Sequence, residues 1–395
     1  MATPSDPAHQ PRLAHLAVAL DGTGWHPASW REPDARPAEV LRAGYWTDLI
    51  GEAERALIDF VTIEDGFTLQ SDHPWRPDDR TDRLRGRLDA VLIAARVAPT
   101  TRHIGLVPTA ITTHTEPFHI SKAIATLDYV STGRAGVRVQ VSSRRDAAAH
   151  VGRRRLPEDR AALVTELFGE AADHVEVLRR LWDSWEDDAE IRDVATGRFI
   201  DSNKLHYIDF TGPHFSVKGP SITPRPPQGQ PIVAALGHVD AAYELIATSA
   251  DVGFVTPHSA EEVTSLVETI AAHRPADADP VRVFADVVVF LDDTAAAARD
   301  RWARLDEVAG AEYLSDAEIF AGTPAQLADL VQQWHAAGAS GLRLRPATLP
   351  HDLRQITDGL VPELQRRGAF RDGYHATTLR GLLGLPRPAN RYATA

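Results

Sequence analysis

Cysteine is absent from this chain of 395 residues. Its absence excludes disulfide bonds, thiolate nucleophiles, iron–sulfur clusters and cysteine zinc sites together. Redox chemistry would therefore need a bound organic cofactor, or a metal held by histidines and carboxylates. The 17 histidines keep the metal option open, but no HxxxH or HxH pair lies on a recognisable helix, and His114 and His119 are wrongly spaced for one helical face. We expect no metal site.

Long apolar runs and a broad positive field are also missing. No stretch approaches the roughly 18 apolar residues of a membrane span, and the first residues lack the apolar core of a signal peptide. The chain carries 55 acidic and 42 basic residues, a formal charge of −13. A field of that sign does not attract nucleic acid or anionic lipid. We therefore expect a cytoplasmic protein that acts on a small molecule, without nucleic-acid or membrane partners.

Short apolar runs alternate with longer segments of helical periodicity, a pattern typical of βα units that build a parallel sheet. Strands are predicted at 13–20, 58–63, 103–107, 136–141, 231–236, 252–255, 281–291 and 341–344. Helices are predicted at 45–57, 88–97, 121–130, 260–273 and 324–337. Eight strands joined by helices favour an α/β fold, the closed (β/α)₈ TIM barrel. No GxGxxG follows the first strand, which argues against an open dinucleotide-binding sheet.

Two segments do not fit the repeating pattern of one barrel domain over 1–395. The segment 185–230 is rich in glycine, proline and charge, and is too long for an ordinary barrel loop. We expect it to be an insertion beside the active-site mouth. The segment 369–395 is predicted to be an arm that packs on the barrel or on a neighbouring subunit, with a disordered tail as the alternative.

Several motifs follow one another in an order that matches a known family. They include GWHPASWR at 24–31, RHIGLVPTAITT at 102–113, LDYVSTGRAG at 127–136, LWDSW at 181–185 and VPELQRRG at 361–368. The chain resembles the bacterial-luciferase-like flavin-dependent monooxygenases, in the branch of nitrilotriacetate monooxygenase, dibenzothiophene-sulfone monooxygenase and the pristinamycin synthase flavin subunit. The matching segments extend over nearly the whole chain.

The resemblance implies a fold, a cofactor and partners. It implies a homo-oligomeric barrel with insertions at the C-terminal face, which binds reduced FMN at the C-terminal ends of its strands. A separate NAD(P)H-dependent flavin reductase would supply the FMN, and O₂ would be used to oxidise a small organic substrate. Two alternatives remain: a flavin-free or weakly flavin-binding, non-catalytic partner subunit on the same barrel, and an F420-dependent oxidoreductase.

Two polar residues follow strands at the end where barrel enzymes collect their working groups. Asp65 comes after the second predicted strand and Thr109 after the third. The resemblance implies that both contact the isoalloxazine ring of the flavin. Alternatively, Asp65 caps the following turn and Thr109 satisfies a strand end. The resemblance also implies a cis non-proline peptide bond near Ala110–Ile111.

The positions that hold the flavin phosphate in the family depart from its pattern. Val164, Leu167 and Phe168 stand where the family carries a histidine followed by an Arg-Tyr pair. An asparagine of the fourth-strand motif is replaced by Arg138, and the serine-bearing turn after the fifth strand reads GHV at 237–239. The usual phosphate clamp is therefore missing from its expected place.

A clamp rebuilt from other residues would restore phosphate binding. Guanidinium suits phosphate because its N–H groups form a planar fork that pairs with two oxygens. We therefore expect Arg138, or one of Arg144 and Arg145, to contact the FMN phosphate together with the turn at Gly237 and His238. The alternative is that the arginines after the fourth strand form only a solvent-exposed face and bind no phosphate.

His26 and His114 are the candidate acid/base residues. Both follow strands on the expected catalytic face, and a histidine near its ordinary pKa can exchange a proton near neutral pH. Trp25 and Trp30 would surround His26 with the apolar wall that a shielded reaction needs. The alternative for each is a hydrogen-bonded loop histidine.

Overall fold

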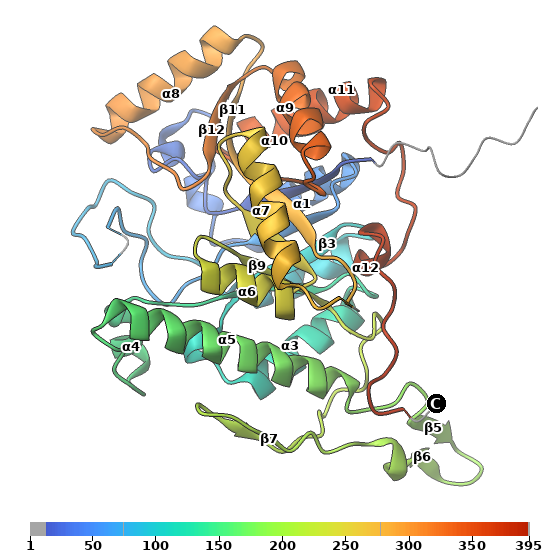
Figure 1. Ribbon diagram of the computed structural model, residues 1–395. Helices are drawn as coiled ribbons and strands as arrows, with labels where there is room; N and C mark the ends of the chain where they lie inside the picture. Colours follow the sequence, from blue (N-terminus) through green and yellow to red (C-terminus); the bar gives the residue numbers. More distant parts are fainter. Residues whose placement is uncertain (1–12, 74, 277, 394–395) are drawn as a thin grey trace, which may run out of the picture.

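A computed structural model describes the chain except residues 1–12, 74, 277 and 394–395. Its centre is a closed ring of eight parallel strands with helices around it (Figure 1). The ring runs β1 (His15–Leu20), β2 (Phe60–Ile63), β3 (Gly105–Ile111), β4 (Gly136–Gln140), β9 (Ile232–Leu236), β10 (Val252–Val255), β11 (Arg282–Leu291) and β13 (Gly341–Pro346). Parallel pairing of β13 with β1, and of β10 with β11, closes it. The predicted (β/α)₈ barrel is confirmed, and each predicted run contributes one of its strands.

Helices cover the outside of the ring because each carries an apolar face toward the strands. They are α1 (Ala43–Arg55), α2 (Ala90–Val97), α3 (Pro117–Val130), α4 (Arg145–Val151), α5 (Arg160–Asp183), α6 (Asp240–Ser249), α7 (Ala260–His273), α8 (Ala295–Ala309), α9 (Pro324–Ala336), α10 (His351–Arg354) and α11 (Val361–Arg366). Side chains fix where several of them begin. Asp159 accepts a hydrogen bond at the start of α5, and Thr323 forms a capping box with Gln326 at the start of α9.

A ninth parallel strand, β12 (Glu318–Gly322), lies outside the ring and was not predicted. It pairs with Val287–Leu291, whereas β10 pairs with the earlier part of β11. Since β13 occupies the other edge of β11 over both stretches, β10 and β12 share one edge. β12 therefore extends the wall of the barrel at its C-terminal mouth.

The segment 185–230 connects the end of α5 to the start of β9 and contains two small hairpins. These pair β5 (Glu190–Asp193) with β6 (Arg198–Ile200) and β7 (Phe210–Thr211) with β8 (Ser216–Val217). A connection from a helix to the next strand lies at the N-terminal end of a barrel. The two ends of this segment therefore lie away from the mouth, while its β7–β8 hairpin reaches back to Arg154, whose Nη1 lies 3.5 Å from His214 Nδ1. The long connections at the mouth are those after β1, β2 and β4.

The last part of the chain crosses the N-terminal end of the barrel and runs to these hairpins (Figure 1). It contains α12 (Leu379–Leu382), and Leu379, Leu383 and Leu385 pack against strand residues such as Phe60. Further along, the Arg387 guanidinium pairs with Asp187, and the Tyr392 ring stacks on His206. The arm thus joins the barrel floor to the hairpin segment within the same chain.

Candidate functional site

A cavity of about 490 Å³ opens at the C-terminal mouth of the barrel. One part of its wall is polar, formed by Glu64, Arg138, Gln140, His238, Asp316 and Arg345. The rest is largely apolar, formed by Trp25, Trp75, Val139, Val141, Phe168, Ala171, Ala235, Leu236, Val239, Ala242 and Leu245, with the small polar Ser143 among them. These residues come mainly from strand ends, from the connections that follow them, and from α5 and α6. A pocket with one polar and one apolar wall orients an amphipathic ligand.

Arg138 lies at the centre of the polar wall. It is buried in the middle of β4, where its Nε donates to the Thr109 hydroxyl at 3.0 Å and its Nη2 donates to Gln140 Oε1 at 2.7 Å. Nη2 also forms an ion pair with Glu64 Oε2. The second carboxylate oxygen, Glu64 Oε1, is buried and has no hydrogen-bond partner. The predicted residues Thr109 and Arg138 are thus brought together, while Glu64 was not predicted.

A second charged cluster continues the polar wall. Buried Asp286 forms ion pairs with both Arg343 and Arg345, and Arg345 reaches Asp316 with an Nη1–Oδ1 distance of 2.6 Å. Burial works to raise the pKa of Asp286, but the two arginines outweigh it and lower the pKa. Asp286 therefore remains ionised inside the barrel.

His238 connects this cluster to the cavity. Its Nε2 lies 3.3 Å from Asp316 Oδ2 and its Nδ1 lies 3.3 Å from the Thr256 hydroxyl. Burial lowers its pKa, so the ring is neutral at neutral pH. The preceding Gly237 donates its N–H to Phe254 O, and a Cβ there would meet the Tyr243 ring at 2.6 Å. This turn therefore needs glycine to bring His238 to the cavity.

Asp65 directs its carboxylate at the backbone. One oxygen accepts from Gly66 N at 2.7 Å and the other from Ala90 N at 2.9 Å, so Asp65 ties the β2 end to the start of α2. It does not line the barrel-mouth cavity. The peptide bond between Ala110 and Ile111 is trans, contrary to expectation: the cis bonds of the described chain are Gly219–Pro220 and Leu349–Pro350.

His26 lies in a smaller hollow of about 180 Å³, which shares Trp25 with the larger cavity. Its Nδ1 accepts from Ala28 N at 3.1 Å, which leaves Nε2 to donate to Asp306 Oδ1 at 3.1 Å. Burial lowers its pKa. Both ring nitrogens are therefore engaged, and the ring does not face the larger cavity.

His114 also lies away from the cavity lining. It follows β3, and its ring packs edge-on against Phe67 with centroids 6.1 Å apart. Its Nε2 is buried without a hydrogen-bond partner, and burial together with nearby Arg154 lowers its pKa. The structure thus does not bring His26, His114 and His238 together.

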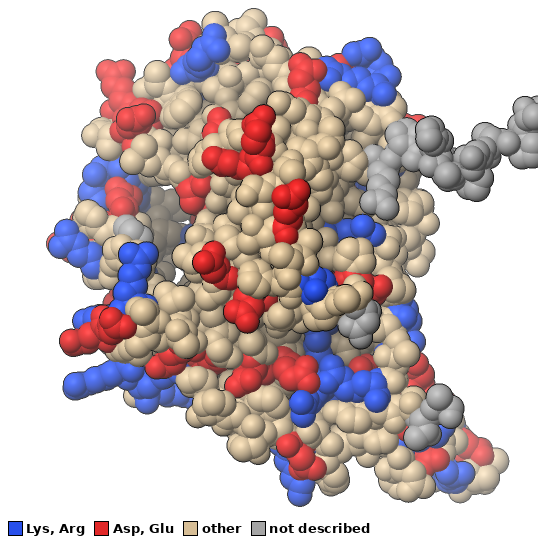
Figure 2. Space-filling view, in the orientation of Figure 1, with Lys and Arg blue, Asp and Glu red and all other residues tan. Residues whose placement is uncertain are grey.

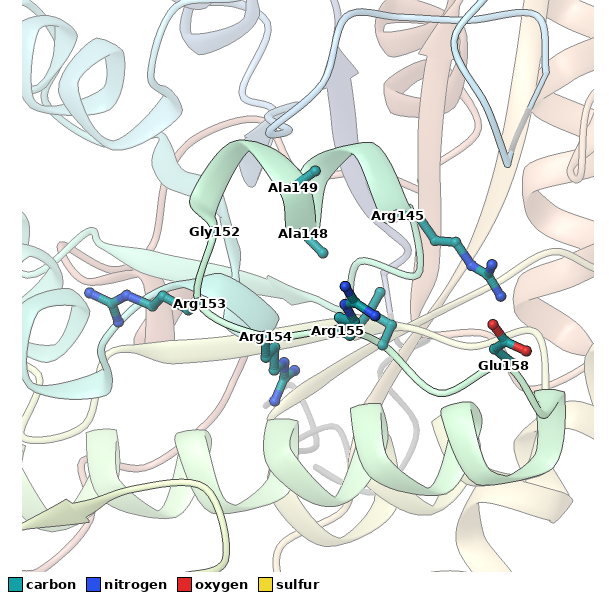
Figure 3. Close-up of a pocket in the computed structure, with 9 residues that line it drawn as sticks. Arg145, Ala148, Ala149, Gly152, Arg153, Arg154, Arg155 and Glu158 are labelled. Carbon is teal, nitrogen blue, oxygen red and sulfur yellow. The ribbon is translucent and has the colours of Figure 1, made fainter.

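Arginines after β4 surround a hollow of about 500 Å³ between α4 and the loop that precedes α5 (Figure 3). Arg153 pairs with Glu116 and points away from the hollow. Arg145 forms no ion pair within the described chain, and it points toward Glu158 across the hollow. Arg144, the other predicted candidate, is bound to Asp146. Arg145 is therefore the free cation of the predicted pair.

The residues of the polar wall that sequence reasoning missed are Glu64, Gln140, Asp316 and Arg345. Two of them carried a signal. Glu64 directly follows β2, as Asp65 does, and Arg343 and Arg345 alternate within an otherwise apolar strand, so both face the barrel interior. Asp316 lies in a loop with no comparable pattern.

Other kinds of site find little support in the part of the chain that the structure describes. It contains no group of three or more histidine, aspartate or glutamate side chains arranged to hold a metal ion. None of its helices is long and apolar enough to span a bilayer. On the face shown in Figure 2, acidic and basic side chains are interspersed.

Comparisons with known proteins agree with this geometry. The model of the luciferase-like monooxygenase family matches residues 26–321. The chain is 32% identical to N-acetyl-S-(2-succino)cysteine monooxygenase of Bacillus subtilis strain 168, over 96% of this chain and 98% of that protein. It is 29% identical to nitrilotriacetate monooxygenase component A of Aminobacter aminovorans, with the same coverage of 96% and 98%. Among solved structures, EDTA monooxygenase from Chelativorans sp. BNC1 superposes with a TM-score of 0.82 at 24% identity, covering 95% of this chain and 99% of that one.

Proposed function

The chain belongs to the luciferase-like monooxygenase family, and from this premise we propose that it is the oxygenase component of a two-component system. In this proposal it uses reduced FMN and O₂ to oxidise a small organic substrate. A separate NAD(P)H-dependent reductase supplies the FMN, and the enzyme works as a homo-oligomer in the cytoplasm. The observation that carries the proposal is the cavity at the barrel mouth, the end at which barrel enzymes hold their active sites.

The cavity fits the flavin ring system. An isoalloxazine has a polar pyrimidine edge and an apolar dimethylbenzene edge, which correspond to the two kinds of wall. Its volume of about 490 Å³ lies within the usual range for small-molecule sites, about 300–1,000 Å³. Glu64 Oε1, a buried acceptor without a donor, matches the N–H of the pyrimidine edge.

The phosphate of FMN needs a different partner. Phe168 and Leu245 give the cavity an apolar end, where an unpaired dianion would be costly. Ser143 lines the cavity, and Arg145, two residues further along, has no ion-pair partner among the described residues. We propose that Arg145 and His238 meet the phosphate, while Arg138 holds the ring. This assignment replaces Arg138 as the main phosphate contact, because its guanidinium is fixed by Glu64, Thr109 and Gln140.

Bound reduced FMN supplies the electrons for the reaction of O₂ with the substrate. The chain supplies orientation, shielding and proton handling. The Arg138 guanidinium holds the polar edge of the ligand, and the apolar wall around Phe168 and Trp25 keeps water away. His238 can take up a proton where it meets the phosphate, and the Asp316 carboxylate beside Nε2 would stabilise the charged ring.

Binding and turnover test this proposal. Oxidised and reduced FMN are titrated against the protein by fluorescence and absorbance, the reduced form without oxygen. O₂ uptake is then followed with NADH, a flavin reductase and candidate substrates, beginning with N-acetyl-S-(2-succino)cysteine and nitrilotriacetate. We expect FMN binding and product formation that depends on both reductase and protein. Binding of neither form of FMN would instead favour the non-catalytic subunit, and selective binding of F420 would favour the third alternative.

A negative charge placed inside the cavity tests this proposal, and the same charge placed outside the cavity is the control. Phe168→Glu should abolish FMN binding, because it sets a carboxylate in the apolar end of the pocket. Leu314→Glu introduces the same charge at a leucine that is 79% exposed and outside the cavity, and should leave binding unchanged. Equal binding by both variants would place the flavin site elsewhere.

A further inference from the structure

We propose that Glu64 and Arg138 together bind the lactam edge of the flavin ring, where an N–H lies beside a carbonyl, through two hydrogen bonds. Glu64 Oε1 accepts from the flavin N3–H and Arg138 Nη1 donates to the adjacent carbonyl oxygen. This inference rests on the proposed function, because it takes the occupant of the cavity to be a flavin. It assigns a binding role to Glu64 and separates ring recognition from phosphate recognition.

The first support is the unpaired oxygen of Glu64. The Glu64 side chain is 9% exposed, and its Oε2 is bound to Arg138. Its Oε1 is shielded from water and has no hydrogen-bond partner. Buried polar atoms nearly always have a partner, because leaving one unpaired costs free energy, and more for a charged group. A ligand that carries a hydrogen-bond donor would remove this deficit.

The position of this atom connects it to the cavity. Several buried side-chain atoms of the described residues lack hydrogen-bond partners. Among them, Glu64 Oε1 is the one that belongs to a residue lining the barrel-mouth cavity, and it is the one carboxylate oxygen. An ionised carboxylate only accepts hydrogen bonds. The missing partner must therefore be a donor, such as a lactam N–H.

Arg138 provides the complementary donor. Its Nε and Nη2 are held by Thr109, Gln140 and Glu64, which fixes the plane of the guanidinium. Within the described chain, Nη1 forms no hydrogen bond. The fixed pair therefore offers one acceptor and one donor side by side, and a lactam edge offers the opposite arrangement. Both groups are held in place before binding, which lowers the entropic cost of recognition.

The surrounding charges leave this pair close to neutral. Arg138 faces Glu64 directly, with Asp286, Arg343 and Arg345 as the next charged groups inside the barrel. Asp286 is already paired with both of those arginines. The pair of Glu64 and Arg138 therefore suits a neutral hydrogen-bonding edge better than an anionic group, which agrees with assigning the phosphate to Arg145 and His238.

Methylation of the ligand tests the contact without altering the protein. FMN and its N3-methyl derivative are titrated against the wild-type protein by flavin fluorescence. Removing the N3–H deletes one charge-assisted hydrogen bond and sets a methyl group against the carboxylate. We expect the derivative to bind at least about tenfold more weakly.

Two variants complete the experiment. Glu64→Gln keeps the shape of the side chain but loses its charge, so FMN should bind about tenfold more weakly and the penalty for N3-methylation should shrink. Glu32→Gln is the matched control: Glu32 is also buried and paired with an arginine, Arg304, through both oxygens, and it lies outside the cavity. It should leave both affinities unchanged.

The outcomes separate this inference from the proposed function. If wild-type protein binds FMN and its N3-methyl derivative equally well, the inference is overturned while the flavin function stands. If FMN does not bind at all, the proposed function and the inference both fail. If Glu64→Gln does not fold, the difference in wild-type affinity between FMN and its N3-methyl derivative is sufficient to test the inference.

Discussion

Two buried carboxylates at the N-terminal end of the barrel differ from Glu64 at the C-terminal mouth in how completely their oxygens are paired. At the N-terminal end, Asp59 accepts from Leu16 N, His15 and Arg371, and Asp251 accepts from Val233 N, Arg179 and Arg380. Every oxygen of these two carboxylates has a partner. At the C-terminal mouth, Glu64 Oε1 has none. Asp59 and Asp251 are completed by groups of the chain itself, which suits a structural role, whereas the free oxygen of Glu64 can be completed by a ligand.

The largest effect is expected from breaking the N-terminal end. Asp251→Ala would leave Arg179 and Arg380 buried without their carboxylate, which we expect to cost about 3–5 kcal/mol of unfolding free energy. Urea unfolding measures this loss, and FMN affinity of the folded protein should not change. The surface pair of Glu190 and Arg192 is the control, where Glu190→Ala should have a much smaller effect on stability. A similar loss in both variants would contradict the comparison.

Lowering the pH should weaken the stabilisation that Asp59 provides at the N-terminal end. Burial works to raise the pKa of Asp59, but His15 and Arg371 outweigh it and hold the pKa at about 2. Because the folded pKa lies below the unfolded value of about 3.9, Asp59 stabilises the fold above about pH 4, and this stabilisation disappears as the pH falls toward 2. The contribution should be roughly 2–3 kcal/mol.

Urea midpoints between pH 5 and pH 2 measure this dependence. Asp59→Asn should flatten it, because the asparagine does not titrate. The exposed Asp34, changed in the same way, should leave the dependence as it is. An unchanged slope in Asp59→Asn would show that other groups determine the acid sensitivity.

A smaller effect is expected at the mouth, where binding should change and stability should not. Arg145→Glu should weaken FMN binding about tenfold and leave riboflavin binding unchanged, because only FMN carries the phosphate. Arg198→Glu, on the exposed β6 strand, is the control for net charge. Equal losses for FMN and riboflavin would remove Arg145 from the phosphate site.

The smallest effect concerns a mouth residue that the structure uses as scaffold. Asp65→Ala removes the two hydrogen bonds to the Gly66 and Ala90 amides, which should cost about 1 kcal/mol of stability. FMN affinity should not change, and Asp65→Asn should lose less stability because it keeps an acceptor. Weaker FMN binding at unchanged stability would restore the predicted ring contact.

Apolar periodicity was sufficient to predict the barrel, because buried parallel strands are near-continuous apolar runs. β12 escaped this pattern, since its residues are mostly half-buried and it begins with Glu318. The position of the two ends of segment 185–230 follows from its connection, which its length alone does not give. It leads from a helix into a strand, and such connections lie opposite the mouth.

The site was partly predictable for the same reason. Thr109 and Arg138 lie within barrel strands and His238 follows one. Arg138 and His238 line the cavity, and Thr109 contacts Arg138. Glu64 could have been predicted from its place directly after β2, whereas Asp316 could not, because it lies in a loop without a pattern. The ring-contact role of Asp65 and the acid/base roles of His26 and His114 remain predictions.

The route of the C-terminal arm has a consequence for synthesis on the ribosome. β1 cannot pair with β13 until residue 346 has emerged, and the barrel floor lacks Leu379 and Leu383 until later still. Asp59 and Asp251 also lack their ion-pair partners Arg371 and Arg380 until the C-terminal arm has been synthesised. The nascent chain must therefore carry an open barrel with exposed apolar strands for most of its translation. Unpaired apolar strands of such a chain are open to association with other chains until the barrel closes.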